Sequence, residues 1–253
     1  MPLLQTQNLK VKIADTVACE RLNISFNAGE SWAVLGMNGS GKTTILHTLA
    51  GILHPQQGDV LINDKNITDL SRKTIAQNLG LLLQHQEDHF PGTVLQSVLI
   101  GRHPHLQNWQ WDSEEDINIA KKALAALVLS DLSERSILTL SGGERQRVAL
   151  ATLLTQQTKI RLLDEPVNHL DLHQQHEVMK LFTQDKSEQS NIFVLHDINL
   201  AARYCDNVLL LLGNGETLHG AVDDVLTEQN LSNLYKHPIS EISQHSQKYF
   251  IAS

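Results

Sequence analysis

Short apolar runs recur along the chain, separated by stretches in which apolar residues follow helical spacing. Runs of this length predict strands, and we expect Ser31–Leu35 to be buried. The other strand patterns are Val60–Ile62, Ile160–Leu163, Ile192–Leu195 and Val208–Leu212, and Leu79–Leu83 is a further apolar run that ends at Gln84. A helix is predicted over 44–53, where apolar residues recur at helical intervals until Pro55 ends the pattern. Strands alternating with helices predict an α/β fold whose mainly parallel sheet is covered on both faces.

The two ends of the chain have other patterns. Leu9–Ile13 and Leu22–Phe26 alternate apolar and polar residues, which predicts half-exposed strands in an N-terminal antiparallel β subdomain. Gly213–Gly215 predicts a hairpin turn. Beyond Val225 we expect a short helix and an edge strand.

From Gln84 to about residue 157 the pattern is helical, with helices predicted at Val94–Ile100 and Glu114–Leu129. We interpret this segment as an α-helical subdomain, about 85–157, inserted into a core of about 1–84 and 158–225. A tail, 226–253, completes a single domain of 253 residues.

Composition indicates an ordinary soluble globular protein, 41% hydrophobic and 19% charged. The net charge of −8 predicts no nucleic-acid partner, because nucleic acid requires a basic face. The longest apolar run is too short to cross a bilayer, and the N-terminus lacks the pattern of a signal peptide. Cys19 and Cys205 lie far apart, which favours a reducing, cytoplasmic setting.

The segment Gly36–Thr44 carries the clearest chemistry. It reads Gly36, Met37, Asn38, Gly39, Ser40, Gly41, Lys42, Thr43, Thr44, which fits the phosphate-binding loop. Glycines let backbone N–H groups approach a phosphate at the start of a helix. We expect Lys42 to reach the outer phosphates of a nucleotide and the Thr43 hydroxyl to bind Mg²⁺. An accidental glycine-rich turn would not explain the flanking strand and helix.

Two further motifs suit a bound nucleotide. The strand Ile160–Leu163 ends in Asp164 and Glu165; the first can hold Mg²⁺, and the second can act as general base on a water. Alone, this acidic pair is equally consistent with an exposed loop. Ser141-Gly142-Gly143 precedes a helical pattern and predicts a second anion-binding helix N-terminus. A cap explains the serine, but not two glycines, which are poor helix formers.

These motifs, in this order, resemble the ATP-binding cassette subunit of an ABC transporter, with a P-loop NTPase (RecA-like) core, over nearly the whole chain. Leu140–Gln146 matches the signature motif and Ile160–Asp164 the second nucleotide motif. The other matches are Gln84 at the Q-loop glutamine, Asn168–Asp171 at the D-loop and His196 at the switch histidine.

The resemblance implies an ATPase that works as a homodimer and uses ATP and Mg²⁺. ATP would lie between the phosphate loop of one copy and Ser141, Gly142, Gly143 and Asp171 of its twin. The catalytic residues implied are Lys42, Gln84, Glu165 and His196, and the Mg²⁺ ligands are Thr43, Gln84 and Asp164. The resemblance also implies two transmembrane permease subunits and a periplasmic substrate-binding protein that acts indirectly. It further implies that the ATPase is located peripherally on the cytoplasmic face of the inner membrane.

Cargo depends on resemblance alone, because the ATPase subunit does not touch it. Gly92–Val94, Gly101–Pro104 and Tyr249–Ile251 resemble importers of vitamin B12 (cobalamin) or of iron chelates such as siderophores and haem. The longer stretch Gly101–Trp111, with Trp109 and Trp111, looks most like the subunits of cobalamin importers. Two alternatives are a soluble cassette protein acting in assembly or on nucleic acid, and a nucleotide-binding scaffold without turnover. The acidic charge and missing coiled-coil insertion disfavour the first, and Glu165 disfavours the second.

Three features depart from a simple match. Ile13 stands about where many family members carry an aromatic that stacks on adenine, so we expect weaker ATP affinity, or adenine held by apolar contact. Arg161 interrupts a buried strand, and we expect it to pair with a carboxylate or to reach water. His169, His173 and His176 would share one helix face with metal-ligand spacing, although a structural or solvated role is the simpler interpretation.

Overall fold

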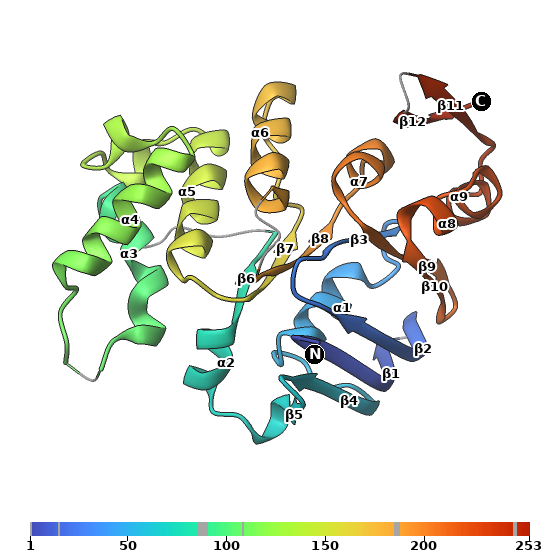
Figure 1. Cartoon of the computed structure of the whole chain (residues 1–253), viewed down its shortest axis with the longest axis horizontal. Helices are drawn as coiled ribbons and strands as arrows, with labels where there is room; N and C mark the ends of the chain where they lie inside the picture. The colour runs from blue at the N-terminus through green and yellow to red at the C-terminus, as the bar shows by residue number, and fades with distance from the viewer. Residues whose placement is uncertain (1, 15, 85–90, 108, 185–187, 245–246) are drawn as a thin grey trace.

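The computed structural model describes the chain except for residues 1, 15, 85–90, 108, 185–187 and 245–246. Its centre is a six-stranded sheet of order β10-β9-β3-β8-β7-β6 (Figure 1). The strands are β3 (Ser31–Gly36), β6 (Leu79–Leu82), β7 (Ile160–Asp164), β8 (Ser190–Val194), β9 (Asn207–Gly213) and β10 (Glu216–Ala221). All neighbouring pairs are parallel except β9 and β10, which form the hairpin predicted at Gly213–Gly215. The predicted mainly parallel sheet is confirmed.

Side chains of the sheet alternate between two hydrophobic cores. On β3, Ala33 and Leu35 belong to a core shared with the helices that follow β6, whereas Trp32 and Val34 belong to a core shared with α1 (Lys42–Leu49) and the N-terminal strands. Because both faces are covered, the central strands read as continuous apolar runs.

A separate antiparallel sheet of order β2-β1-β4-β5 covers α1. Its strands are β1 (Leu4–Ile13), β2 (Thr16–Phe26), β4 (Gln57–Ile62) and β5 (Lys65–Asn66). This sheet confirms the predicted antiparallel N-terminal strands and lies in the lower part of Figure 1. The chain then passes through η1 (Ile67–Asp69) and α2 (Arg72–Asn78) to β6.

Helices predominate among the described residues between β6 and β7, as predicted. They are α3 (Val94–Leu99), η2 (Ile100–His105), α4 (Glu114–Ala126), η3 (Ser130–Leu132), η4 (Ile137–Thr139) and α5 (Gly142–Thr155). They gather at one end of the molecule, which we call the helical lobe (94–155; Figure 1). A buried ion pair, Arg102 Nε to Asp116 Oδ1 at 2.7 Å, joins η2 to α4. Hydrogen bonds from Ser113, with a further contribution from Arg102, lower the pKa of Asp116 to about 2.

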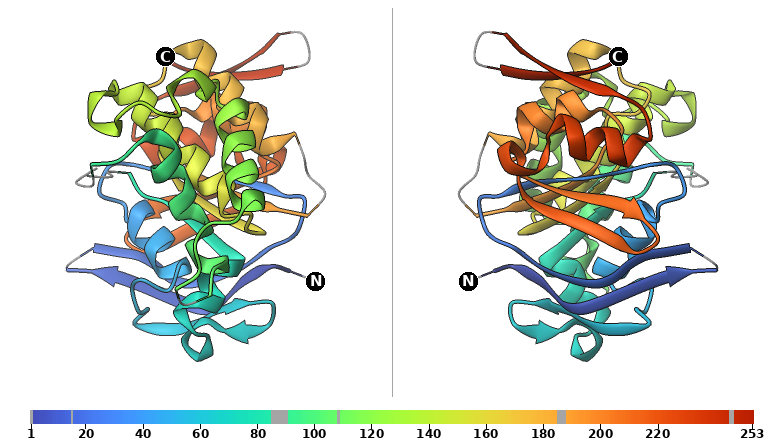
Figure 2. Two further views of the ribbon diagram at one scale, coloured as in Figure 1. Left: turned by 90° about the vertical axis from the view of Figure 1, so that its left-hand side faces the viewer. Right: turned by 90° about the vertical axis from the view of Figure 1, so that its right-hand side faces the viewer.

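After β7 come α6 (Leu172–Thr183), α7 (Ile198–Tyr204), α8 (Val222–Val225) and α9 (Glu228–Tyr235). The expected short helix in the tail is confirmed, but the expected edge strand is wrong. β11 (Ile239–Gln244) and β12 (Gln247–Ala252) pair with each other in a sheet of their own, because β10 already forms that edge of the central sheet. Figure 2 shows this hairpin at the end of the molecule opposite the N-terminal sheet.

The helix predicted over 44–53 also extends beyond the observed end of α1. The helix ends at Leu49, and Gly51 follows with a φ of 69°. The Ile52 N–H donates to the His47 carbonyl at 2.9 Å, a closure typical of a helix that ends at a left-handed glycine. The helical spacing continues through Ile52 and Leu53, but both are exposed. None of the helices in the described part of the chain has the length and apolar character needed to span a membrane.

Candidate nucleotide-binding site

The phosphate loop connects the buried end of β3 to the start of α1. Gly41 caps α1 with a φ of 94°, and a Cβ at this position would lie 2.5 Å from the Cβ of Ala18. Only glycine therefore fits there, on grounds of both conformation and space. Met37, Asn38 and Gly39 are exposed, so the loop is open to a ligand.

Lys42 points its ammonium group back into this loop. Its Nζ donates to the carbonyl oxygens of Gly36 at 2.8 Å and Met37 at 3.0 Å, and the residue is 6% exposed. Burial lowers the pKa of Lys42, while the nearby charges of Glu165 and Asp164 act in the opposite direction. The sequence-predicted lysine and the two acids therefore lie close enough to interact.

Asp164 ends β7 and is fully buried. Among the residues that the structure describes, neither of its carboxylate oxygens has a hydrogen-bond partner of good geometry, although the Thr43 hydroxyl is near enough to influence it. Burial raises the pKa of Asp164, and Thr43 offsets part of that shift. An unpartnered buried carboxylate beside a hydroxyl is a suitable donor set for a divalent cation such as Mg²⁺.

Three side chains converge on Glu165, the next residue. His196 Nε2 donates to Oε1 at 2.6 Å, Asn168 Nδ2 donates to Oε2, and Gln84 forms a further hydrogen bond. Burial by itself would raise the pKa of Glu165, but the hydrogen bond and charge of His196, followed by the other two donors, bring it below its ordinary value. The carboxylate is consequently ionised at neutral pH.

The backbone of Glu165 is also unusual. Its φ is 51°, a left-handed conformation in a residue that is 8% exposed. Non-glycine residues held in this region cost on the order of 1 kcal/mol or more and cluster at functional sites. The sequence indicated Asn168 only as part of the D-loop match, and its side-chain contact with Glu165 was not predicted. Their separation of three residues could have indicated the contact, because the Asn168 N–H donates to the Glu165 carbonyl in a turn that brings the two residues together.

A second exposed group lies at the start of α5. Ser141 caps the helix in a capping box: its N–H donates to Glu144 Oε2 at 2.7 Å, and its Oγ accepts from the Glu144 N–H at 3.3 Å. A Cβ on Gly143 would lie 3.0 Å from the His169 carbonyl oxygen, whereas the described residue nearest to a Cβ on Gly142 is His169, whose own Cβ would lie 3.9 Å away. The capped start of α5 is as predicted. The residues of this chain that lie nearest to Gly142 and Gly143 belong to the D-loop and α6, not to the phosphate loop.

The D-loop itself leads into α6. Asp171 is exposed and caps α6 by accepting a hydrogen bond from the Gln174 N–H at 2.8 Å. α6 begins at Leu172, so His169 lies before the helix. The expectation that His169 shares one helix face with His173 and His176 is therefore wrong.

Arg161 lies at the second position of β7 and is 7% exposed, so the expectation that it reaches water is wrong. Its guanidinium stacks 5.6 Å from the centre of the Phe182 ring on α6. The polar loop expected around His85 and His89 lies outside the described residues.

A phosphate loop faced by two acids at the end of a strand, of which Glu165 is ionised and anchored by hydrogen bonds, defines a P-loop nucleotide hydrolase. Residues 19–168 match the family model described as "ABC transporter". The chain belongs to the ABC transporter family and is an ATPase of that family.

Individual relatives extend the match beyond the family model. The petrobactin import ATP-binding protein of Bacillus anthracis is 38% identical over 237 residues, which cover 92% of this chain and 86% of that protein. The hemin import ATP-binding protein of Pseudomonas aeruginosa is 38% identical and covers 92% of each chain. A metal-chelate type ABC transporter solved in an inward-facing conformation superposes with a TM-score of 0.86 at 29% identity, covering 100% of this chain and 98% of that one.

Proposed function

We propose that this chain is the ATP-hydrolysing subunit of an importer, and that two copies clamp two ATP molecules at shared seams. Each seam would combine the Lys42 loop of one copy with Ser141, Gly142, Gly143 and Asp171 of the other. Two permease subunits in the membrane would receive the conformational change, with the ATPases peripheral on the cytoplasmic face. A periplasmic binding protein would act only indirectly, and no nucleic acid is involved.

Gly142 carries this proposal. Glycine in a helix costs up to about 1 kcal/mol relative to alanine, and packing inside this chain leaves room for a Cβ at Gly142. Together with the exposure of Ser141 and Gly142 at a helix N-terminus, this supports close approach by an anion from another molecule.

The chemistry proposed at the site is phosphoryl transfer to water. Lys42 would exchange its two loop carbonyls for phosphate oxygens and neutralise their charge. Glu165, ionised and held by His196 and Asn168, would orient the attacking water and accept its proton. Thr43, Asp164 and Gln84 would hold Mg²⁺, which when bound supplies further charge neutralisation. In the structure Gln84 bonds the Glu165 carboxylate, so it would exchange that contact on binding the ion.

Ser141→Arg tests the seam. The added bulk and charge should prevent ATP-driven dimerisation and reduce ATPase activity to background, while ATP binding to the monomer is retained. Ser130→Arg, the same substitution at an exposed position of the helical lobe, is the control and should behave as wild type. Light scattering with and without ATP measures the dimer. An ATP-driven dimer in Ser141→Arg would contradict the proposal.

We favour an iron chelate as the cargo, because the relatives reported above are named for petrobactin and hemin import. Cobalamin is the second candidate. Reconstitution with the cognate permease and labelled ferric siderophore, haem and cobalamin would decide between them: ATP-dependent uptake of cobalamin alone would contradict the iron assignment.

A further inference from the structure

The side chain of Gln146 extends from the helical lobe to the end of β7. Gln146 lies in the second turn of α5 and is half-buried. Its Nε2 donates to the carbonyl oxygen of Pro166 at 2.9 Å and, more weakly, to that of Glu165 at 3.5 Å. A carbonyl oxygen can only accept hydrogen bonds, so the amide nitrogen of Gln146 is the donor. This amide therefore connects the helical lobe to the turn that carries the proposed general base.

The backbone at this turn depends on its hydrogen bonds. Glu165 has a φ of 51°, and a non-glycine residue keeps such a conformation only where the surrounding structure determines it. The Glu165 N–H donates to the carbonyl of Val194 at 3.2 Å, and the Asn168 N–H donates to the Glu165 carbonyl at 3.2 Å. These bonds come from the core and from the turn itself. The bonds of Gln146 come from the helical lobe, so the direction of the Glu165 side chain also depends on where the lobe lies.

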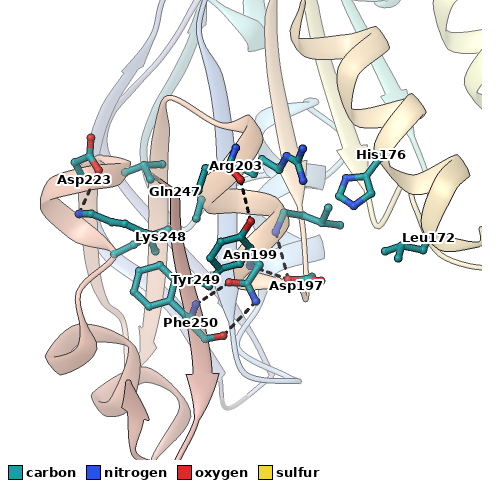
Figure 3. Close-up of a pocket in the computed structure, with 14 residues that line it drawn as sticks. Leu172, His176, Asp197, Asn199, Arg203, Asp223, Gln247, Lys248, Tyr249 and Phe250 are labelled. Carbon is teal, nitrogen blue, oxygen red and sulfur yellow. Dashed lines mark hydrogen bonds and ion pairs between the residues drawn. The ribbon is translucent and has the colours of Figure 1, made fainter. Parts of the chain in front are cut away.

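The histidine that anchors the Glu165 carboxylate is fixed from another direction. His196 directly precedes α7, whose N-cap Asp197 accepts from the Asn199 N–H at 2.7 Å. The Asn199 side chain pairs with both backbone groups of Phe250 on β12, accepting from its N–H at 2.7 Å and donating to its carbonyl at 3.1 Å (Figure 3). These bonds hold the start of α7 through the core and the C-terminal tail, whereas the amide bonds described above come from the helical lobe.

The helix that carries Gln146 also begins with the proposed contact to the second ATP. Ser141 caps α5, and Gln146 follows five positions later on the same helix. A helix transmits displacement as a rigid element, so a phosphate that engages Ser141 also sets the position of Gln146. In the proposed dimer, Ser141 of one copy contacts the ATP of one seam, while Glu165 of that same copy acts on the ATP of the other seam.

We infer that Gln146 is a positioning residue for Glu165, and that it couples the base at one seam to the signature helix at the other. The inference rests on the proposed function, because it requires the two shared seams. When α5 engages ATP at one seam, the Gln146 amide holds the turn after β7 so that Glu165 faces the attacking water at the other. Displacement of α5 from the core withdraws the amide from both carbonyls, and the base loses its alignment. Occupation of one site thus promotes hydrolysis at the other.

Gln146→Met tests the positioning role, because methionine is unbranched and similar in size but has no N–H donor. We expect kcat to fall about tenfold or more, since a displacement of about 1 Å in an active site can cost on the order of 100-fold in rate. ATP affinity and the ATP-driven dimer should be retained, because the phosphate loop and the Ser141 cap are unchanged. Gln146→Glu, which replaces the donor by an acceptor of the same shape, should show the same pattern. Phosphate release, equilibrium ATP binding, light scattering and thermal unfolding are measured on each variant.

Gln156→Met is the matched control. Gln156 ends the same helix, and its Nε2 also donates to two backbone carbonyls, those of Ala76 at 2.7 Å and Leu79 at 3.3 Å. Leu79 pairs with Ile160 at the start of β7, the opposite end of that strand from Glu165. Loss of these bonds should affect stability in a similar way but leave kcat at the wild-type level.

Mixed dimers separate the positioning role from an effect on the signature contact. In the proposed seam, Glu165 hydrolyses the ATP held by its own phosphate loop, while Ser141 of the twin contacts that ATP. One active copy is therefore mixed with an excess of Glu165→Gln copies, so that each mixed dimer has a single base, and hydrolysis is measured in a single turnover. Gln146→Met in the active copy should slow hydrolysis about tenfold or more. The same change placed in the Glu165→Gln copy should have no effect.

Each outcome has a distinct meaning. If Gln146→Met turns over as fast as Gln156→Met, or if both lose activity equally, the inference is overturned and the seams stand. A loss of the ATP-driven dimer in Gln146→Met, or slower hydrolysis when the change is in the Glu165→Gln copy, would show that the residue acts through the signature contact and would also overturn the inference. If the wild-type protein forms no dimer with ATP, the proposed seams themselves fail.

Discussion

Replacing Glu165 with Gln isolates the proposed base from the rest of the site. The carboxylate accepts hydrogen bonds from His196, Asn168 and Gln84, and an amide of the same shape can still accept some of them. Because its nitrogen would face a donor, we expect a loss of about 1 kcal/mol in unfolding free energy. The variant should therefore remain folded.

The effect on turnover should be far larger. A positioned general base contributes about 10²–10⁴-fold to rate, which corresponds to roughly 3–5 kcal/mol in the activation barrier. ATP affinity should change little, because Glu165 lies outside the phosphate loop. Removal of its negative charge, which acts on Lys42, should if anything favour the phosphates. The expected pattern is thus a loss of kcat with ATP binding retained.

Phosphate release at saturating ATP and equilibrium binding of ATP, measured on the same preparation, distinguish these effects. The control is Glu177→Gln, the same substitution at an exposed glutamate on α6 that pairs with Lys180 at 2.8 Å. It should keep wild-type turnover. A decrease in kcat of less than tenfold for Glu165→Gln, or a parallel loss of ATP binding, would refute the role assigned to this residue.

Two further predictions concern the lobe and the adenine site. The pKa of Asp116 is lowered to about 2, so its ionised form stabilises the fold above its ordinary pKa near 3.8, and that contribution is lost as the pH falls through about 2. Asp116→Asn should lower the free energy of unfolding by about 2 kcal/mol at pH 7. Urea titrations should show the difference in unfolding free energy between wild type and variant disappearing between pH 4 and 2. A difference that stays constant over this range would contradict a stabilising role for the ionised Asp116. Ile13 is 49% exposed at the end of β1, and Ile13→Tyr should tighten ATP binding by about fivefold or more, since stacking on a base contributes roughly 1–3 kcal/mol. Unchanged or weaker affinity in a binding titration would reject a stacking role there.

Features encoded within a few residues could be predicted from the sequence. Gly41, Lys42 and the preceding strand specify a phosphate loop because conformation, helix start and charge all lie within one short segment. The capped start of α5 at Ser141 was predictable for the same reason. Apolar periodicity likewise identified the parallel strands, because a strand buried on both faces must be apolar throughout.

The end of α1 was predicted wrongly because two local features of the sequence disagree there. Helical spacing continues through Ile52 and Leu53, but the left-handed Gly51 had already ended α1. Periodicity counts apolar positions, whereas the end of a helix is set by backbone conformation.

Only the tertiary structure decided which distant groups meet. His196 lies 31 positions from the Glu165 that it bonds, and no pattern along the chain measures that distance. The same is true of Arg161 stacking on Phe182, and of Asn199 holding the C-terminal hairpin through Phe250. Local sequence sets propensity and spacing, but the partner of a buried charge or an unpaired strand edge depends on how separate elements pack.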